Sequence, residues 1–336
     1  MKEFTHYLEN LSNCPFCKET LSSAKHVLSN NGFNIIECQG CGMSLVNPRP
    51  GKEVIQTFYP EKSHTHSIPV SSFKNKIREK IFIEAGLYPS TYRNFFEQLL
   101  CRALAGILRS QVNPIIPYRG GGKLLDVGCG NGDFLRLVRT AGWDTYGVDV
   151  DIKALKAAKN GYHKLICGTL DSIGFSSFHF DAITILNVLE HCHDPLQVLK
   201  NCNRILKHDG IIVVCVPNFE CLELKIFEAD WMGIQNPLHL FHFNLITLSE
   251  MLKCAGFEIV DIKFKIWSRI SELESYSIWK KKYAATASFW SALVRRPFVV
   301  RLRKLMAIVR YKPVSQIAPF ITVYARKDKA FGLDTK

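Results

Sequence analysis

The stretch LLDVGCGNGDFL, residues 124–135, decides the fold of this chain. An apolar run leads into three alternating glycines, Gly128, Gly130 and Gly132, and an amphipathic segment follows them. Glycines at this position let the backbone come close to a ligand at the N-terminus of a helix. The stretch therefore predicts a strand, a ligand-binding loop and a helix. A tight turn that binds no ligand is the alternative.

An acidic residue stands where such a loop needs one. Asp149 closes the next apolar run, about 20 residues on, where a carboxylate can accept hydrogen bonds from both hydroxyls of a ribose. The Gly-x-Gly-x-Gly spacing, preceded by Asp126, favours a cofactor that carries an amino acid over a dinucleotide such as NAD. Capping of the loop is the alternative role for Asp126.

The chain around this loop alternates short apolar runs with amphipathic stretches, which is typical of βαβ units and a parallel sheet. We predict an α/β fold with a doubly wound, seven-stranded, Rossmann-like sheet. Its last strand should include residues 322–325, after a helical insertion over about 266–316. An insertion of that length is far longer than the usual connection of about 2 to 6 residues.

Two cysteine pairs near the N-terminus follow the C-x2-C pattern. Cys14 and Cys17 are separated from Cys38 and Cys41 by 20 residues, which is typical of a four-cysteine zinc ribbon. A Zn²⁺ ion held by four thiolates has no open position, so it would stabilise the small unit and perform no chemistry. Four free cysteines, or a redox pair, are the alternative.

The domain boundaries follow from these patterns. We predict a zinc-ribbon unit over residues 1–60, which closes near the run NPRPG, a helical linker over 61–118, and an α/β domain over 119–336. Apolar residues at four-residue steps predict two helices in the linker. These residues are Phe73, Ile77, Ile81, Phe96, Leu100, Leu104 and Leu108.

Composition narrows the setting. The 336 residues carry a formal net charge of +13, so an anionic partner such as nucleic acid, a phosphorylated substrate or an acidic membrane would be attracted. The start of the chain has no apolar run of the signal-peptide type, and no apolar segment reaches the roughly 20 residues of a membrane-spanning helix. We expect a cytoplasmic protein whose membrane contact, if any, is peripheral.

The motifs LLDVGCGNGDFL, YGVDVD, FDAITILNVLEHCHDPLQVLKNCNRILKHDGIIVVCVPN and AGFEIV together resemble class I S-adenosylmethionine-dependent methyltransferases, from about residue 123 to 327. The resemblance implies that S-adenosyl-L-methionine binds here, with the three glycines shaping the methionine pocket and Asp149 holding the ribose. The remaining implied contacts are Asp126, Cys129, Val150, Thr169, Leu170 and Asn187. Many relatives carry an acid where this chain has Thr169, so the adenine contact would fall to the Leu170 backbone or to Asp171.

The ribbon, the run NPRP and Tyr59 resemble the zinc-ribbon methyltransferases of bacterial sugar C-methylation and of glycan and natural-product pathways. His239 resembles their base-bearing histidine, although Leu238 stands where they have glutamate. We take His239 and His242 as catalytic candidates, because both follow the fifth strand, and a structural role in the core is the alternative for each.

The pair Glu190-His191 resembles the ubiquinone-pathway O-methyltransferases, in which a further acid completes a divalent-metal site. Asn187 stands in that region here. The absence of that acid argues against a metal-assisted mechanism.

These observations predict a methyltransferase for a small-molecule, glycosyl or lipid-linked acceptor. An RNA methyltransferase that uses the ribbon and basic surface, or a non-catalytic S-adenosylmethionine-binding module, are the alternatives.

The insertion contains the stretch of the chain in which basic residues most outnumber acidic ones. Residues 278–312 hold ten Lys and Arg and no Asp or Glu. Interleaved with them are Trp279, Tyr283, Phe289, Trp290, Phe298, Leu302, Leu305 and Ile308, which predict either an interfacial helix that binds an acidic membrane or a lid packed on the catalytic domain.

Overall fold

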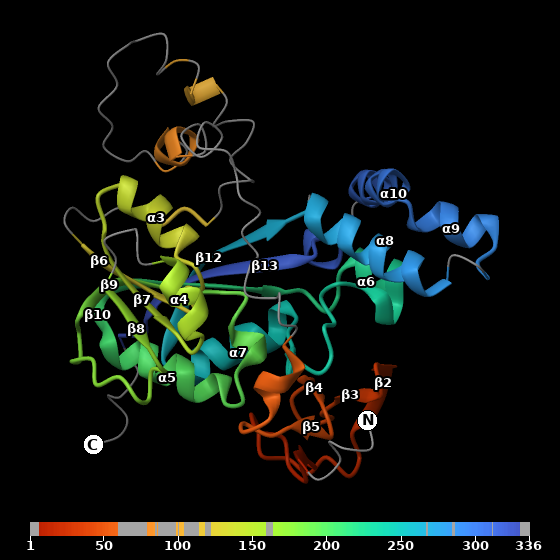
Figure 1. Cartoon of the computed structure of the whole chain (residues 1–336), viewed down its shortest axis with the longest axis horizontal. Helices are drawn as coiled ribbons and strands as arrows, with labels where there is room; N and C mark the ends of the chain where they lie inside the picture. The colour runs from red at the N-terminus through yellow and green to blue at the C-terminus, as the bar shows by residue number, and fades with distance from the viewer. Residues whose placement is uncertain are drawn as a thin grey trace.

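The structure is a computed structural model, which describes residues 7–59, 79–84, 86, 99, 101–103, 114–117, 122–158, 164–266, 268–283, 286–310 and 312–329. Most of the predicted linker lies outside these residues, including Phe73, Ile77, Phe96, Leu100, Leu104 and Leu108. Within it, residues 79–84 are helical, and Ile81 and Phe82 are buried against the α/β domain. Figure 1 shows this domain with the ribbon below it and a helical group to one side.

A seven-stranded sheet forms the centre, as predicted, in the order β12-β13-β10-β9-β6-β7-β8. Only β13 runs antiparallel to its neighbours. The strand order reverses between β6 and β9, which is where open α/β sheets bind ligands. The strands are β6 (Lys123–Val127), β7 (Asp144–Asp149), β8 (Lys164–Cys167), β9 (Phe180–Leu186), β10 (Leu206–Pro217), β12 (Phe257–Lys265) and β13 (Phe320–Lys327).

Helices cover both faces of this sheet (Figure 1). α3 (Asp133–Thr140) and α4 (Ile152–Ala158) pack on one face, and α5 (Pro195–Ile205) and α7 (Leu245–Cys254) pack on the other. The strands are apolar on both sides because both sides are covered. Asp194 caps α5 by accepting a hydrogen bond from the Gln197 backbone at 2.9 Å, which fixes where the chain turns after β9.

The ribbon is joined to the α/β domain through a shared sheet. β2 (Lys25–Asn30), β3 (Phe33–Glu37) and β4 (Ser44–Val46) form a meander, and β11 (Phe241–His242) adds a fourth strand beside β4. The ribbon also contains a separate two-stranded sheet of β1 (Leu8–Glu9) and β5 (Arg49–Pro50), which is followed by the short helix η2 (Ile55–Phe58). The ribbon therefore contacts the segment that carries both candidate histidines.

The insertion between β12 and β13 is helical, as predicted. It contains α8 (Arg269–Tyr283), α9 (Phe289–Arg295) and α10 (Pro297–Val309), which pack beside α6 (Leu222–Phe227) at one end of the molecule (Figure 1). The expectation that Trp279 and Tyr283 are membrane anchors is wrong, because Trp279 is 4% exposed and Tyr283 packs in the same apolar cluster. Among the described residues, no helix has the length and apolar character needed to cross a membrane.

Candidate functional site

The glycine loop between β6 and α3 has the backbone that its sequence predicts. Gly128, Gly130 and Gly132 have φ values of 72°, 51° and 75°, a region that favours glycine. A side chain at Gly128 would also place its Cβ 2.3 Å from a methyl group of Val188. The loop therefore needs glycine both for its conformation and for its close contact with the segment that follows β9.

Asp149 is already engaged with this loop. Its carboxylate accepts hydrogen bonds from the backbone N–H of Gly130 at 2.7 Å and of Asp151 at 2.8 Å. These bonds fix the carboxylate at the carboxyl end of β7, beside the glycines, where the resemblance places the ribose. Gly168, after β8, donates to the Asp149 carbonyl at 2.9 Å, so the predicted adenine region is tied to the same strand end.

The other predicted cofactor residues differ in how far their side chains are exposed. Val150 is 55% exposed, whereas Leu170 is buried, and the Thr169 N–H is satisfied by the Ser172 hydroxyl at 3.0 Å. Asn187 follows β9 with φ of 55° and donates its N–H to the Cys215 carbonyl at 2.8 Å. Each of these residues lies just beyond a strand, at the edge of the sheet where the glycine loop lies.

The side chains of Asp126 and Cys129, two more of the predicted cofactor residues, are buried beneath the glycine loop. The Asp126 carboxylate accepts a 2.6 Å hydrogen bond from the Thr184 hydroxyl, which links β6 to β9 beneath the loop. Burial raises the pKa of Asp126 to about 7. Cys129 is 7% exposed, with its sulfur directed at Gly147 of β7. Both side chains support the loop from below.

A second polar cluster begins four residues after β9. Glu190, His191 and His239 each offer a ligand atom, and these atoms all lie within 4.8 Å of one another. Glu190 is 1% exposed, and neither of its carboxylate oxygens has a hydrogen-bond partner among the described residues. Burial raises the pKa of Glu190 to about 8. Buried polar groups without partners are rare in folded proteins and often mark a ligand site.

A hydrogen bond from one ring nitrogen of His239 fixes the orientation of its imidazole ring. Its Nδ1 donates to the Gly233 carbonyl at 2.8 Å, so the Nε2 atom carries the lone pair. Burial, with the nearby His191 and His242 rings, holds the pKa of His239 well below its usual range. The ring is therefore neutral at pH 7 and can accept a proton or bind a cation.

His242, the second catalytic candidate, lies at the edge of this cluster. Its ring centroid is 6.4 Å from that of His239, and it stacks at a tilt on Phe219 at 4.8 Å. Its Nε2 atom is buried without a partner among the described residues, and burial lowers its pKa to about 3. The structure thus brings the two predicted histidines together.

Tyr59 joins the cluster from the end of the ribbon. Its hydroxyl lies 3.4 Å from Nδ1 of His191, which also contacts the Leu238 carbonyl at 3.0 Å. Burial raises the pKa of Tyr59 to about 12, with further contributions from the charges of Cys192, Glu190 and Asp149. From the sequence, Tyr59 is only a mark of resemblance, and Glu190 and His191 are predicted to have no catalytic role. The clue was the Glu-His pair after a buried strand.

The four cysteines of the ribbon converge as predicted. The sulfurs of Cys14 and Cys41 are 3.8 Å apart, and those of Cys17 and Cys38 are 3.6 Å apart. Four thiolates around a Zn²⁺ ion with bonds of about 2.3 Å would have sulfurs about 3.8 Å apart. The spacing is far too long for a disulfide and fits a tetrahedral metal site.

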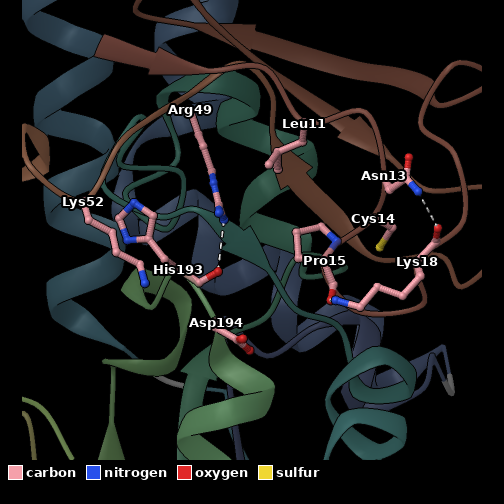
Figure 2. Close-up of a pocket in the computed structure, with 9 residues that line it drawn as sticks. All are labelled: Leu11, Asn13, Cys14, Pro15, Lys18, Arg49, Lys52, His193 and Asp194. Atoms are coloured by element: carbon pink, nitrogen blue, oxygen red, sulfur yellow. Dashed lines mark hydrogen bonds between the residues drawn. The ribbon is translucent and has the colours of Figure 1, made fainter. Parts of the chain in front are cut away.

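A cavity of about 310 Å³ lies where the ribbon meets the start of α5 (Figure 2). Arg49 crosses it, donating to the His193 carbonyl at 3.1 Å and to Glu9 at 3.0 Å. Neither the glycine loop nor the Glu190 cluster lines this cavity. The guanidinium group of Arg49 is already paired with Glu9. It belongs to the joint between ribbon and catalytic domain. Its lining is Leu11, Asn13, Cys14, Pro15, Lys18, Arg49, Lys52, His193 and Asp194.

Comparison with known proteins agrees with this geometry. A family of methyltransferase domains matches residues 94–262, just over half of the chain, and the chain belongs to this family. The predicted relationship to S-adenosylmethionine-dependent methyltransferases is thereby confirmed.

Two curated relatives illustrate the range of the family. A probable S-adenosylmethionine-dependent methyltransferase from Mycolicibacterium smegmatis is 27% identical over 143 residues, which cover 42% of this chain and 54% of that protein. A ubiquinone biosynthesis O-methyltransferase from Haemophilus ducreyi is 32% identical over 148 residues, 39% of this chain and 62% of that protein. The match thus spans between half and two thirds of each relative's length.

Among solved structures, a SAM-dependent methyltransferase from Archaeoglobus fulgidus is 23% identical with a TM-score of 0.44, over 70% of this chain and all of that one.

Proposed function

We propose that this protein transfers the methyl group of S-adenosyl-L-methionine to a small-molecule, glycosyl or lipid-linked acceptor held beside the Glu190 cluster. One observation carries the proposal: Val188 contacts Gly128 of the glycine loop, and Glu190 follows two residues later. The loop, Asp149 and the unpaired buried groups therefore lie at one edge of the sheet. A cofactor and its acceptor require such a pair of adjoining sites.

The chain's own residues suit such a transfer. The bound cofactor would supply an electrophilic methyl group on its sulfonium. His239, neutral and held by the Gly233 carbonyl, would take the proton from the acceptor atom at Nε2 as that atom attacks. Above its raised pKa of about 8, Glu190 would be ionised, and its carboxylate, whose ligand atom lies within 4.8 Å of that of His239, would then stabilise the resulting imidazolium.

A divalent cation is the second candidate role for this cluster. Two imidazoles and one carboxylate within 4.8 Å form a donor set that transition metals accept, and the unpaired oxygens of Glu190 fit it. The ubiquinone-pathway enzymes complete their metal site with an acid in the region where this chain has Asn187. In this chain His239, which lies 49 positions after Glu190, would take the place of that acid. The cation would then orient the acceptor in place of a proton-accepting histidine.

The ribbon cysteines would hold one structural Zn²⁺ ion. Metal analysis of protein purified without added zinc should find one zinc per chain, lost in Cys38→Ser. If the Glu190 cluster also binds a cation, wild type should contain a second metal that Glu190→Gln removes while the ribbon zinc stays. One metal per chain in both proteins would assign the cluster to acid and base chemistry.

The central test is cofactor binding followed by methyl transfer. Calorimetry should show binding of S-adenosylmethionine and its demethylated product, with affinity reduced at least tenfold in Asp149→Ala, about the loss of one charge-assisted hydrogen bond. Lys156→Ala, on the surface of α4, is the matched control. Binding of NAD alone would contradict the proposal.

Labelled methyl donor incubated with separated pools of small molecules, lipids and RNA would then identify the acceptor. Label in RNA would favour an RNA methyltransferase, and binding without transfer to any pool would favour a non-catalytic module.

A further inference from the structure

Helix α10 buries a lysine on its inner face and leaves most of its large apolar residues exposed. Val300, Lys304 and Ala307 form the face packed on α6 and α8. Lys304 is fully buried, bonded to the carboxylates of Glu223 and Glu272 and to the Ile266 carbonyl at 2.9 Å. A charged residue thus occupies a central position on the buried face of α10. The larger apolar residues of the helix are therefore not covered by this packing.

Those apolar residues form one continuous stripe on the opposite face. Successive helical residues are about 100° apart, so positions 298, 302, 305, 306 and 309 fall within an arc of about 100°. Each is exposed, from Phe298 at 77% and Val309 at 68% to Leu302 and Met306 at 46%. A lid would bury such a stripe against the catalytic domain, and this one faces away from it.

Basic side chains border the stripe on both margins. On the same helical wheel Arg301 lies on one side, and Arg303 and Arg310 lie on the other. Arg301 is paired with Glu272 at 2.6 Å, whereas Arg303 and Arg310 form no ion pair within the described part of the chain. No Asp or Glu occurs between positions 278 and 312 to offset these charges.

The neighbouring helix α9 adds two exposed aromatic rings. Phe289 and Trp290 are 68% and 71% exposed and contact each other edge to face at 5.5 Å between centroids. In contrast, Arg295 stacks on the buried Trp279, and Lys282 pairs with Asp230. The outward groups are therefore aromatic, aliphatic and basic, whereas Arg295 and Lys282 are turned toward partners on the protein itself.

We propose that this surface, the α9–α10 face, docks on an anionic phospholipid bilayer. Its residues are Phe289, Trp290, Phe298, Leu302, Arg303, Leu305, Met306, Val309 and Arg310. An apolar stripe between arginines matches acyl chains at its centre and acidic headgroups at its margins. Nucleic acid would leave the aliphatic residues without a role, and a second copy would bring like charges together. The α9–α10 face lies at one end of the molecule (Figure 1) and is independent of the proposed chemistry.

Flotation of the full chain with vesicles tests the proposal. Wild type should float with phosphatidylglycerol–phosphatidylcholine vesicles at low salt and remain behind with pure phosphatidylcholine. Because each basic residue near an acidic surface adds about fivefold to the affinity, Arg303→Glu with Arg310→Glu should weaken binding about 30-fold or more. Phe298→Ser with Val309→Ser should weaken it with all charges kept.

Lys156→Glu with Lys200→Glu is the matched control. It makes the same change in net charge on α4 and α5, which lie away from α10 in Figure 1, and it should float like wild type. Both serine substitutions are at highly exposed positions, so the fold should survive, which circular dichroism would check.

The proposal is overturned if wild type ignores acidic vesicles, or if the control loses binding as much as the α9–α10 variants. It is also overturned if wild type forms a dimer that the serine variant dissociates while flotation is absent, or if only RNA binds.

Discussion

Two buried groups of side chains in the described part of the chain, one around Lys304 and one around Glu190, differ in how their carboxylates are paired. Around Lys304, Glu223 and Glu272 are both 0% exposed, and each has a cationic partner, with Ser271 and Arg301 completing the set. Glu190 is equally buried, yet its two oxygens have no partner among the described residues.

We interpret this difference as that between a structural role and a functional one. A buried charge is costly unless it is paired, so a fully paired cluster can be explained by folding alone. An unpaired one persists when a ligand completes it, and groups with strongly shifted pKa values concentrate at such sites. The comparison predicts that substitutions in the first cluster change stability and that substitutions in the second change chemistry.

The largest expected effect is that of His239→Ala on turnover. Removal of a general base typically costs about 10²- to 10⁴-fold in rate, whereas affinity for S-adenosylmethionine should change less than threefold. Rates would be measured with labelled methyl donor and the identified acceptor, and His208→Ala, an exposed histidine, is the control. Unchanged turnover would make His239 a residue of the core.

Lys304→Met should lower the free energy of unfolding by about 3 to 5 kcal/mol, because it leaves two buried carboxylates without their shared cation. Urea denaturation followed by circular dichroism measures this. Arg303→Met, at the next and exposed position, should stay within about 0.5 kcal/mol. Adding Glu223→Gln to Lys304→Met should recover part of the loss. A Lys304→Met protein as stable as wild type would remove the contrast between the clusters.

The smallest effect concerns pH. The pKa of Glu190 is raised from 4.5 to about 8, so the folded state holds this proton after the unfolded state has released it. Stability from this group is therefore lost as pH rises, by at most about 1.4 kcal/mol per pH unit.

The pKa of Asp126 is raised to about 7, so between pH 7 and pH 8 its contribution is fading, and comparison with Glu190→Gln isolates the contribution of Glu190. Urea denaturation should show a steeper fall for wild type than for Glu190→Gln. Equal slopes would mean that Glu190 is ionised throughout, as a bound cation would require.

Local patterns predicted much of this protein. The glycine loop, Asp149 at the end of the next strand and the two cysteine knuckles depend on residues close in sequence or on a repeated spacing, so their placement could be predicted from the sequence. The seven-stranded sheet and the helical insertion were predicted for the same reason, because apolar runs of strand length and basic amphipathic stretches are local signals.

Contacts between distant residues were decided only by the tertiary structure. Tyr59, Glu190 and His239 meet although they come from three separate parts of the chain, since the ribbon sheet takes β11 as its fourth strand. Lys304 was counted with the basic surface residues, yet it is buried, because its partners Glu223 and Glu272 come from α6 and α8. Periodicity shows that a helix has two faces, and only the packing of its neighbours decides which face is buried.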